Sequence, residues 1–152
     1  MALKIGDKIP SFTLSDQDGN FFEVKSLLQK KALVIYFYPK DETPGCTKQA
    51  CAFRDGYEDF KDAGAEVIGI SSDSEASHMS FAKHHNLPFI LLSDKAGELR
   101  TQFGVPDDLF GLLPGRVTFV VDKQGVIKLI FNSQMRIDKH IAEALRVLKD
   151  LK

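Results

Sequence analysis

The sequence has little of what marks several classes of protein. Its 152 residues include two cysteines, which are too few for a fold built on disulfides. Lysine and arginine number 20 against 21 acidic residues, so the formal net charge of −1 lacks the basic excess of nucleic-acid-binding domains. No apolar run approaches the roughly 20 residues that span a bilayer. We therefore expect neither a nucleic-acid partner nor a membrane partner.

Signals for targeting and for subdivision of the chain are also missing. The first seven residues lack the apolar stretch of a signal peptide. There is no internal repeat, low-complexity tract or linker, and the length fits one domain over residues 1–152 with a sizeable core. We expect a cytoplasmic bacterial protein, or a plastid protein from which a transit peptide has been removed.

The chain alternates between β-rich apolar runs and amphipathic segments. Residues 32–38 are continuously apolar, as in a strand buried on both faces. Further strands are predicted at residues 66–71 and 89–92, and hairpins at 12–24 and 117–131. Helices are predicted at residues 46–63, 74–86, 95–103 and 138–151. This order predicts an α/β fold with a central mixed β-sheet flanked by helices and an N-terminal β-hairpin.

Particular residues are expected to bound three of these helices. Gly64 should end the helix at residues 46–63, because glycine commonly follows the last turn of a helix. Ser74 and Asp138 are the residues expected to cap the starts of the helices at 74–86 and 138–151.

Both cysteines lie in one run that directly follows the central strand. Pro39 stops that strand, and Cys46 opens the predicted helix, where unpaired N–H groups and a partial positive charge favour a thiolate. The hydroxyl of Thr43 could donate a hydrogen bond to the sulfur, bind a substrate oxygen or cap the helix. A thiolate placed in this way would attack an electrophilic oxygen, as in a peroxide, and the resulting sulfenic acid would condense with a second thiol.

The spacing between Cys46 and Cys51 places a constraint on such a disulfide. On an ideal helix, residues five apart have Cα atoms roughly 8.5 Å apart. Disulfides need a Cα separation of about 4.4–6.8 Å. We therefore hypothesise that a bond between these two residues requires the first turns of the helix to unwind.

The run containing the cysteines resembles the peroxiredoxins. The signature Pro-x-x-x-Thr/Ser-x-x-Cys appears here as Pro39-Lys40-Asp41-Glu42-Thr43-Pro44-Gly45-Cys46. With Cys51 and the residues around it, the run is similar to the subfamily called PrxQ or bacterioferritin comigratory protein. Residues 107–116 are most similar to its cyanobacterial and plastid branch, and the likeness extends over nearly the whole chain.

The resemblance implies a thioredoxin-like fold and thiol-dependent reduction of hydrogen peroxide and organic hydroperoxides. It implies Cys46 as peroxidatic and Cys51 as resolving cysteine, with Thr43 and Pro39 in the active-site loop and Arg116 near the sulfur. It also implies a monomer without cofactor or metal, recycled by thioredoxin or glutaredoxin, with a role in antioxidant defence and redox homeostasis. One difference from many relatives is Gln49, which stands where they carry Glu and is expected to alter only the helix surface.

Three other functions compete with the peroxidase. A disulfide oxidoreductase of thioredoxin type would need the Cys-x-x-Cys pair that is missing here. A redox sensor or holdase would use the same disulfide without peroxidase turnover. A metal-binding protein is disfavoured, because none of the four histidines has metal-ligand spacing with the cysteines. We expect them on the solvated surface, with His84 and His85 on different sides of a helix.

The remaining candidates have structural or undecided roles. Arg54 is expected to pair with a nearby carboxylate rather than to act in catalysis. Phe110, Leu112 and Leu113 lie in a loop bounded by glycine and proline. They are expected to fill the core, with a peroxide pocket or a thioredoxin-docking surface as alternatives.

Overall fold

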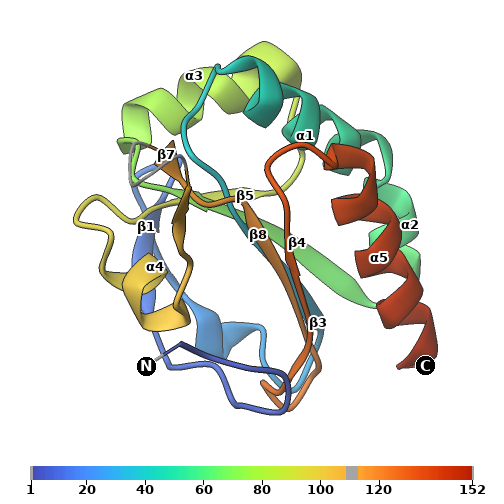
Figure 1. Ribbon diagram of the computed structural model, residues 1–152. Helices are drawn as coiled ribbons and strands as arrows, with labels where there is room; N and C mark the ends of the chain where they lie inside the picture. Colours follow the sequence, from blue (N-terminus) through green and yellow to red (C-terminus); the bar gives the residue numbers. More distant parts are fainter. Residues whose placement is uncertain (1, 109–112, 152) are drawn as a thin grey trace.

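The computed structural model describes residues 2–108 and 113–151, and in these residues a seven-stranded mixed sheet is the central layer (Figure 1). Its strands in spatial order are β2 (Phe21–Glu23), β1 (Thr13–Asp16), β5 (Ile90–Ser93), β4 (Ala65–Ser71), β3 (Ala32–Phe37), β8 (Val117–Val121) and β9 (Ile127–Asn132). The pairs β3–β4 and β4–β5 are parallel, and the other neighbours are antiparallel. The predicted mixed sheet and its N-terminal hairpin are therefore confirmed.

Helices cover both faces of this sheet. They are the 3-10 helix η1 (Val24–Ser26) and the α-helices α1 (Pro44–Asp55), α2 (Tyr57–Asp62), α3 (Glu75–His85), α4 (Glu98–Phe103) and α5 (Ile137–Asp150). Figure 1 shows α4 on the opposite side of the sheet from α1 and α5. A separate two-stranded ribbon pairs β6 (Asp107–Asp108) with β7 (Leu113–Pro114). Among the described residues, none of the helices has the length and apolar character needed to cross a lipid bilayer.

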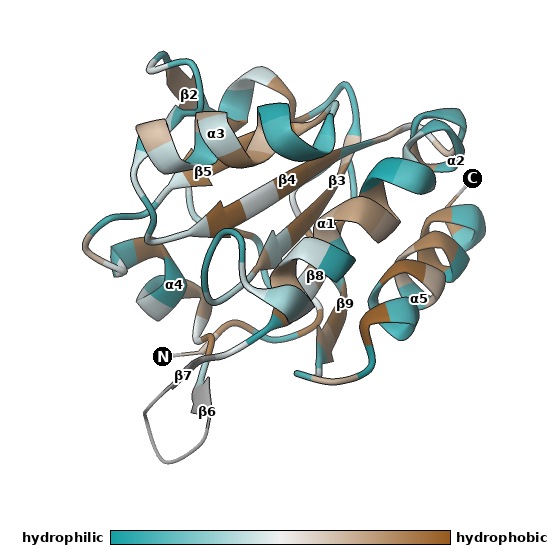
Figure 2. Cartoon of the chain, turned by 90° about the horizontal axis from the view of Figure 1, so that it is seen from above, coloured by the Kyte–Doolittle hydropathy of each residue, from teal (hydrophilic) through white to brown (hydrophobic). Residues whose placement is uncertain are grey.

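Strand β3 is buried on both faces, as its apolar sequence predicts. Val34 and Tyr36 pack into a core beneath α1, α2, α3 and α5, and Leu33 and Ile35 pack into a second core that includes residues of α4. The two sets alternate because successive side chains of a strand point to opposite faces. Figure 2 shows the hydrophobic colouring concentrated on the strands between the more polar helices. Each fully buried apolar side chain contributes about 1.5–3 kcal/mol to stability.

The helix predicted at residues 46–63 differs from the structure at its start and in its middle. Two helices, α1 and α2, meet at Gly56 instead of one continuous helix. Helix α1 also begins at Pro44 rather than at Cys46, because proline is suited to the first helical position, where no N–H is needed. Gly64 follows α2 with a φ of +79°, which confirms it as the residue that ends this segment.

One of the two expected N-caps is confirmed and the other is wrong. Ser74 caps α3, since its hydroxyl oxygen accepts a hydrogen bond from the Ser77 amide at 3.2 Å. Helix α5 begins at Ile137, one residue before Asp138. Ile137 is buried, so packing draws it into the first turn, and Asp138 becomes a helical residue whose carboxylate faces the positive end of the helix dipole.

A buried histidine, His140, joins α5 to β8, so its expected place on the surface is wrong. Its Nε2 donates to the Ser133 carbonyl at 2.7 Å, and its Nδ1 lies 2.7 Å from the Thr118 hydroxyl. A carbonyl only accepts hydrogen bonds, so Nε2 carries the proton in the neutral ring. Burial, and secondly the charge of Arg116, lower the pKa of His140 to about 4, although the bond to Ser133 acts in the opposite direction.

This pKa predicts that the protein loses stability as the pH falls from about 6.5 to about 4. In that window the unfolded chain binds a proton at His140 and the folded chain does not, so protonation favours unfolding. The free energy of unfolding should fall by up to about 3 kcal/mol from this residue. Urea unfolding at pH 7.5 and 4.5 measures it. His140→Gln should show a smaller pH effect, and equal effects in both proteins would contradict the assignment.

Candidate active site

The loop between β3 and α1 is held by a buried polar network centred on Asp41. The Asp41 carboxylate accepts hydrogen bonds from the hydroxyls of Tyr38 and Ser77, at 2.6 and 2.8 Å, and lies 2.7 Å from His78 Nδ1. The Asp41 amide donates to the Asp73 carboxylate at 2.8 Å. Burial, and secondly the Asp41 charge, raise the pKa of Tyr38 well above its usual value, so the phenol stays a donor. The network ties the loop to α3 and to the end of β4.

His78 is a part of this site that sequence reasoning missed. We expected a surface histidine, but its side chain is fully buried, and its Nε2 lies 3.0 Å from the Leu92 carbonyl. The available signal was its position three residues before Phe81, because residues three apart share one face of a helix. Asp41 is a second residue of this kind, because its place in the motif gives it no role of its own in the sequence.

Cys46 is the third residue of α1 and is 1% exposed. Thr43 is the N-cap residue, yet its side chain makes no capping bond; instead its hydroxyl donates to the Lys40 carbonyl at 2.8 Å. Its proton is therefore not directed to the sulfur. Within the described residues the amides of Gly45 and Cys46 donate to no protein group. The helix start thus leaves donors and a partial positive charge beside the thiol.

The guanidinium of Arg116 lies against this first turn of α1. A Cβ atom placed on Gly45 would be 2.9 Å from Arg116 Nη2, so any larger residue there would have to displace the guanidinium. Arg116 is 4% exposed, and no carboxylate pairs with it in the described parts of the chain. Burial, followed by the charge on Cys46, raises the pKa of Tyr36 well above its usual value, with Arg116 acting in the opposite direction. Cys46 and Arg116 are therefore both close enough to Tyr36 for their charges to act on the same hydroxyl.

Gln49 is the hydrogen-bonding partner of Arg116, which corrects the expectation that it lies on the helix surface. Gln49 is fully buried, and its Oε1 accepts a hydrogen bond from Arg116 Nη1 at 2.6 Å. It shares the buried face of α1 with Cys46, Ala50 and Phe53. The spacing of a polar residue among these apolar ones was the signal in the sequence. A neutral amide holds the guanidinium in place without neutralising its charge.

Cys51 lies on the same unbroken helix and is partly exposed. Both thiols are free. Since α1 is continuous from Pro44 to Asp55, the two residues are held at the separation of an ideal helix, about 8.5 Å between Cα atoms. The unwinding hypothesis therefore keeps its geometric basis.

The other candidates are placed as follows. Arg54 forms an ion pair with Asp55 at 3.0 Å and donates to the His85 carbonyl at 2.7 Å, which confirms its pairing with a carboxylate. Pro39 is buried and lines a cavity of about 250 Å³ at the carboxyl ends of β3 and β4, and Cys46 is not among the described residues that line this cavity. Phe110, Leu112 and the side chain of Leu113 lie outside the described residues.

The buried thiol of Cys46 thus has unpaired amides and a guanidinium without a carboxylate partner beside it, and these surroundings favour the thiolate that a thiol-dependent peroxidase uses. The sequence model of the AhpC/TSA family matches residues 5–130, so the chain belongs to this family. Chloroplastic peroxiredoxin Q of Populus jackii is 59% identical over 146 residues, covering 96% of this chain and 68% of the relative. The resemblance to the PrxQ subfamily is confirmed.

Solved structures confirm the thioredoxin-like fold of peroxiredoxins. Peroxidoxin BcpB from Mycobacterium tuberculosis superposes with a TM-score of 0.91 at 37% identity and covers 99% of both chains. The bacterioferritin comigratory protein of Xanthomonas campestris, whose structures address its alkyl peroxide reduction activity, gives a TM-score of 0.84 at 29% identity, covering 95% of this chain and 99% of that one. The family implies a peroxide substrate and a thioredoxin-type reductant.

Proposed function

We propose that Cys46 is the peroxidatic residue of this peroxidase. The observation that carries the proposal is the placement of its buried thiol at the start of α1, with Arg116 across Gly45. The thiolate attacks the terminal peroxide oxygen and the O–O bond breaks. Cys46 becomes a sulfenic acid, and the departing oxygen takes a proton to give water or an alcohol. The alkyl peroxide activity named for the Xanthomonas campestris relative supports organic hydroperoxides beside hydrogen peroxide as substrates.

Arg116 and the amides of Gly45 and Cys46 stabilise the charge that moves onto the oxygens in this step. Thr43 has a complementary part. Because its proton is donated to the Lys40 carbonyl, its oxygen is left to accept a hydrogen bond from the peroxide O–H. Pro39, buried at the end of β3, fixes the direction in which the active-site loop leaves the sheet.

Cys51 resolves the sulfenic acid, in our proposal, by attacking the Cys46 sulfur and releasing water, which leaves a disulfide. A thioredoxin-type dithiol then reduces that disulfide by exchange. The loop at Asp41 is anchored from two sides, whereas the first turn of α1 lacks a side-chain cap, which is commonly worth about 1 kcal/mol. The unwinding that brings the sulfurs together therefore starts at Pro44 and Gly45, in the first turn of α1.

Trapping of the oxidised states tests both cysteine roles. One equivalent of hydrogen peroxide should convert the wild-type protein to a form with no free thiol, because one intramolecular disulfide takes up both cysteines. Cys51→Ser should instead accumulate a sulfenic acid at Cys46 that reacts with dimedone. Mass spectrometry of peptides distinguishes these products. A dimedone adduct at Cys51 in Cys46→Ser, with none at Cys46 in Cys51→Ser, would reverse the assignment.

We also infer a plastid setting and a monomeric state. The relative from Populus jackii is named chloroplastic, which favours the plastid alternative over a bacterial cytoplasm. The exposed large apolar side chains among the described residues come from separate segments of the chain, which supports a monomer: Ile5, Phe21, Met79, Met135 and Leu151. Light scattering after gel filtration should give the mass of one chain, and a dimer mass would contradict the inference.

A further inference from the structure

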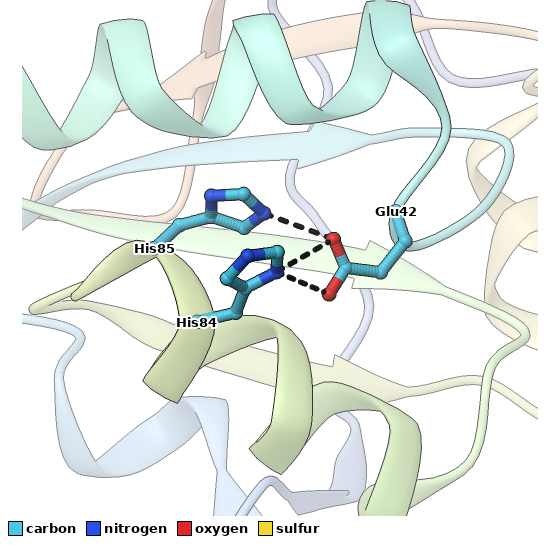
Figure 3. A group of neighbouring side chains, drawn as sticks. All are labelled: Glu42, His84 and His85. Atoms are coloured by element: carbon cyan, nitrogen blue, oxygen red, sulfur yellow. Dashed lines mark hydrogen bonds and ion pairs between the residues drawn. The ribbon is translucent and has the colours of Figure 1, made fainter.

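Beside the active-site loop, the side chains of Glu42, His84 and His85 converge on one point (Figure 3). Glu42 precedes α1, and the two histidines end α3. His84 Nδ1 lies 3.0 Å from Glu42 Oε2, and His85 Nε2 lies 2.9 Å from Glu42 Oε1. Our expectation that consecutive histidines point to different sides is wrong here. His84 reaches the carboxylate with its nearer ring nitrogen and His85 with its farther one, and the ring centroids are 4.1 Å apart.

The three side chains together have the chemistry of a cation site. Hydrogen bonds from His85 and then His84 lower the pKa of Glu42, which keeps its carboxylate ionised at neutral pH. Helix α3 ends at these histidines, so the negative end of its dipole also favours a cation. Arg54, from α1, donates to the His85 carbonyl and holds this helix end in place.

The separations between the donor atoms suit a small divalent ion. Zinc binds imidazole nitrogen at about 2.0–2.1 Å and carboxylate oxygen at about 2.0–2.2 Å in tetrahedral geometry, which sets its donor atoms about 3.4 Å apart. The donor atoms here are 2.9 and 3.0 Å apart across the two contacts, and all three lie within 4.8 Å of one another. If the donor atoms moved apart by about 0.5 Å, a zinc ion could take the place of the protons that Glu42 now shares with the two histidines.

We propose that Glu42, His84 and His85 bind a divalent transition-metal ion of the Zn²⁺ type. Two imidazoles and one carboxylate form a ligand set that zinc accepts, with water at the fourth position. The side chains of Glu42 and His84 are 43% and 65% exposed, so an ion and its water can enter directly. The sequence reasoning missed this site because it compared histidine spacing only with the cysteines.

A second acidic and imidazole group, formed by Asp41, Asp73 and His78, is a weaker candidate. Asp41 and His78 are almost fully buried, and the oxygens of Asp41 already accept hydrogen bonds from Tyr38 and Ser77. Binding an ion there would break the network that holds the active-site loop. The cluster around Glu42 has no such competing role.

A metal at Glu42 would couple to the redox cycle. The ion ties the loop four residues before Cys46 to the end of α3, while Arg54 already ties α1 to the same end. Formation of the disulfide needs the start of α1 to unwind, so the bound ion opposes it. By linkage, the reduced protein binds the ion more tightly than the oxidised one. This coupling rests on the proposed Cys46–Cys51 disulfide, whereas metal binding itself does not.

Zinc titration of the variant with both cysteines replaced by serine tests the binding site alone, because no thiol can act as a ligand. Competition with a chromophoric chelator should show one Zn²⁺ per chain. Adding His84→Ala or Glu42→Gln should weaken binding at least about tenfold. The neighbouring surface change Lys83→Ala should leave it within about twofold. Equal affinity after Glu42→Gln would overturn the proposal, since the loop would then not belong to the site.

The coupling is tested on the wild-type cysteines. Saturating Zn²⁺ should slow disulfide formation after one equivalent of peroxide by about tenfold, because the ion disfavours the opened start of α1 from which the disulfide forms, by a factor within the range usual for coupled binding equilibria. In His84→Ala the same zinc concentration should have no effect. Equal slowing in both proteins would show that zinc acts on the thiols, and the coupling would be overturned. Failure to form any disulfide in zinc-free protein would contradict the proposed function, while the titration would still decide the metal site.

Discussion

Cys46→Ser should reduce peroxide turnover with thioredoxin and thioredoxin reductase to the rate without enzyme. A serine hydroxyl at this position cannot form a sulfenic acid, and without that intermediate Cys51 has no sulfur to attack. Helix α1 would still present its free amides and Arg116 would still lie over Gly45, so peroxide binding would remain while the chemical step is lost. Oxidation of NADPH with hydrogen peroxide as substrate measures the rate.

Stability must be separated from chemistry in this experiment. Cys46 is 1% exposed within the core beneath α1, and an unpaired serine hydroxyl buried there costs about 1–3 kcal/mol. Cys46→Ala removes the thiol without adding a polar group and should be equally inactive. Thermal unfolding followed by circular dichroism shows whether each variant is folded. Turnover above background in either folded variant would refute the assignment of Cys46.

The elements that local pattern specifies were predictable from the sequence. The short apolar run of β3, rich in β-branched and aromatic residues and closed by proline, favours a strand buried on both faces, and the Asp/Gly turns fix the two hairpins. The position of Cys46 just after the central strand follows from the same pattern. The break at Gly56 was not predictable in this way, because Tyr57 and Phe60 continue the helical spacing on its far side.

The polar half of the site was less accessible to sequence reasoning. Arg116 meets Gln49 across 67 residues, and Asp41 meets His78 across 37. No local spacing relates such partners, because they come together only when α1, α3 and the sheet pack. A buried polar group needs a hydrogen-bonding partner. A polar residue at a core-facing position therefore predicts a second polar residue close to it in the fold. Gln49 and His78 were expected on the surface; their helical spacing from Phe53 and Phe81 was the signal for a buried face, but no spacing could name their partners.

The active-site loop is firmly held by hydrogen bonds, whereas the first turn of α1, which follows it directly, is weakly stabilised. Asp41 accepts a hydrogen bond from Ser77 of α3, lies against His78 of the same helix, and donates from its amide to Asp73, two residues after β4. These contacts confine the loop in the reduced protein. The first turn of α1 has no side-chain cap and contains Gly45, the residue with the least resistance to a change of backbone conformation. In the proposed mechanism, the same free amides that stabilise charge during peroxide attack therefore leave this turn easy to open once the sulfenic acid has formed.

Arg116→Met should lower kcat/KM for hydrogen peroxide by about 10²–10³-fold, which is the usual effect of removing one donor to a developing oxyanion. The guanidinium is buried against Gly45 and has no carboxylate partner among the described residues, so in the proposed mechanism its full charge is available to the thiolate and the peroxide oxygens. The exposed Arg146, which pairs with Glu143 on α5, provides a control. Arg146→Met should change kcat/KM by less than about twofold.

A second substitution can separate the loss of stability in Arg116→Met from its loss of activity. Arg116→Met alone leaves the Gln49 Oε1 buried without a donor, at a cost of about 1–3 kcal/mol in stability. Adding Gln49→Met replaces both partners by apolar side chains and should restore most of that stability. Activity should stay low in the double variant, because the positive charge is still missing. Recovery of kcat/KM together with stability would show that Arg116 supports the fold of α1 and does not stabilise the reacting oxygens.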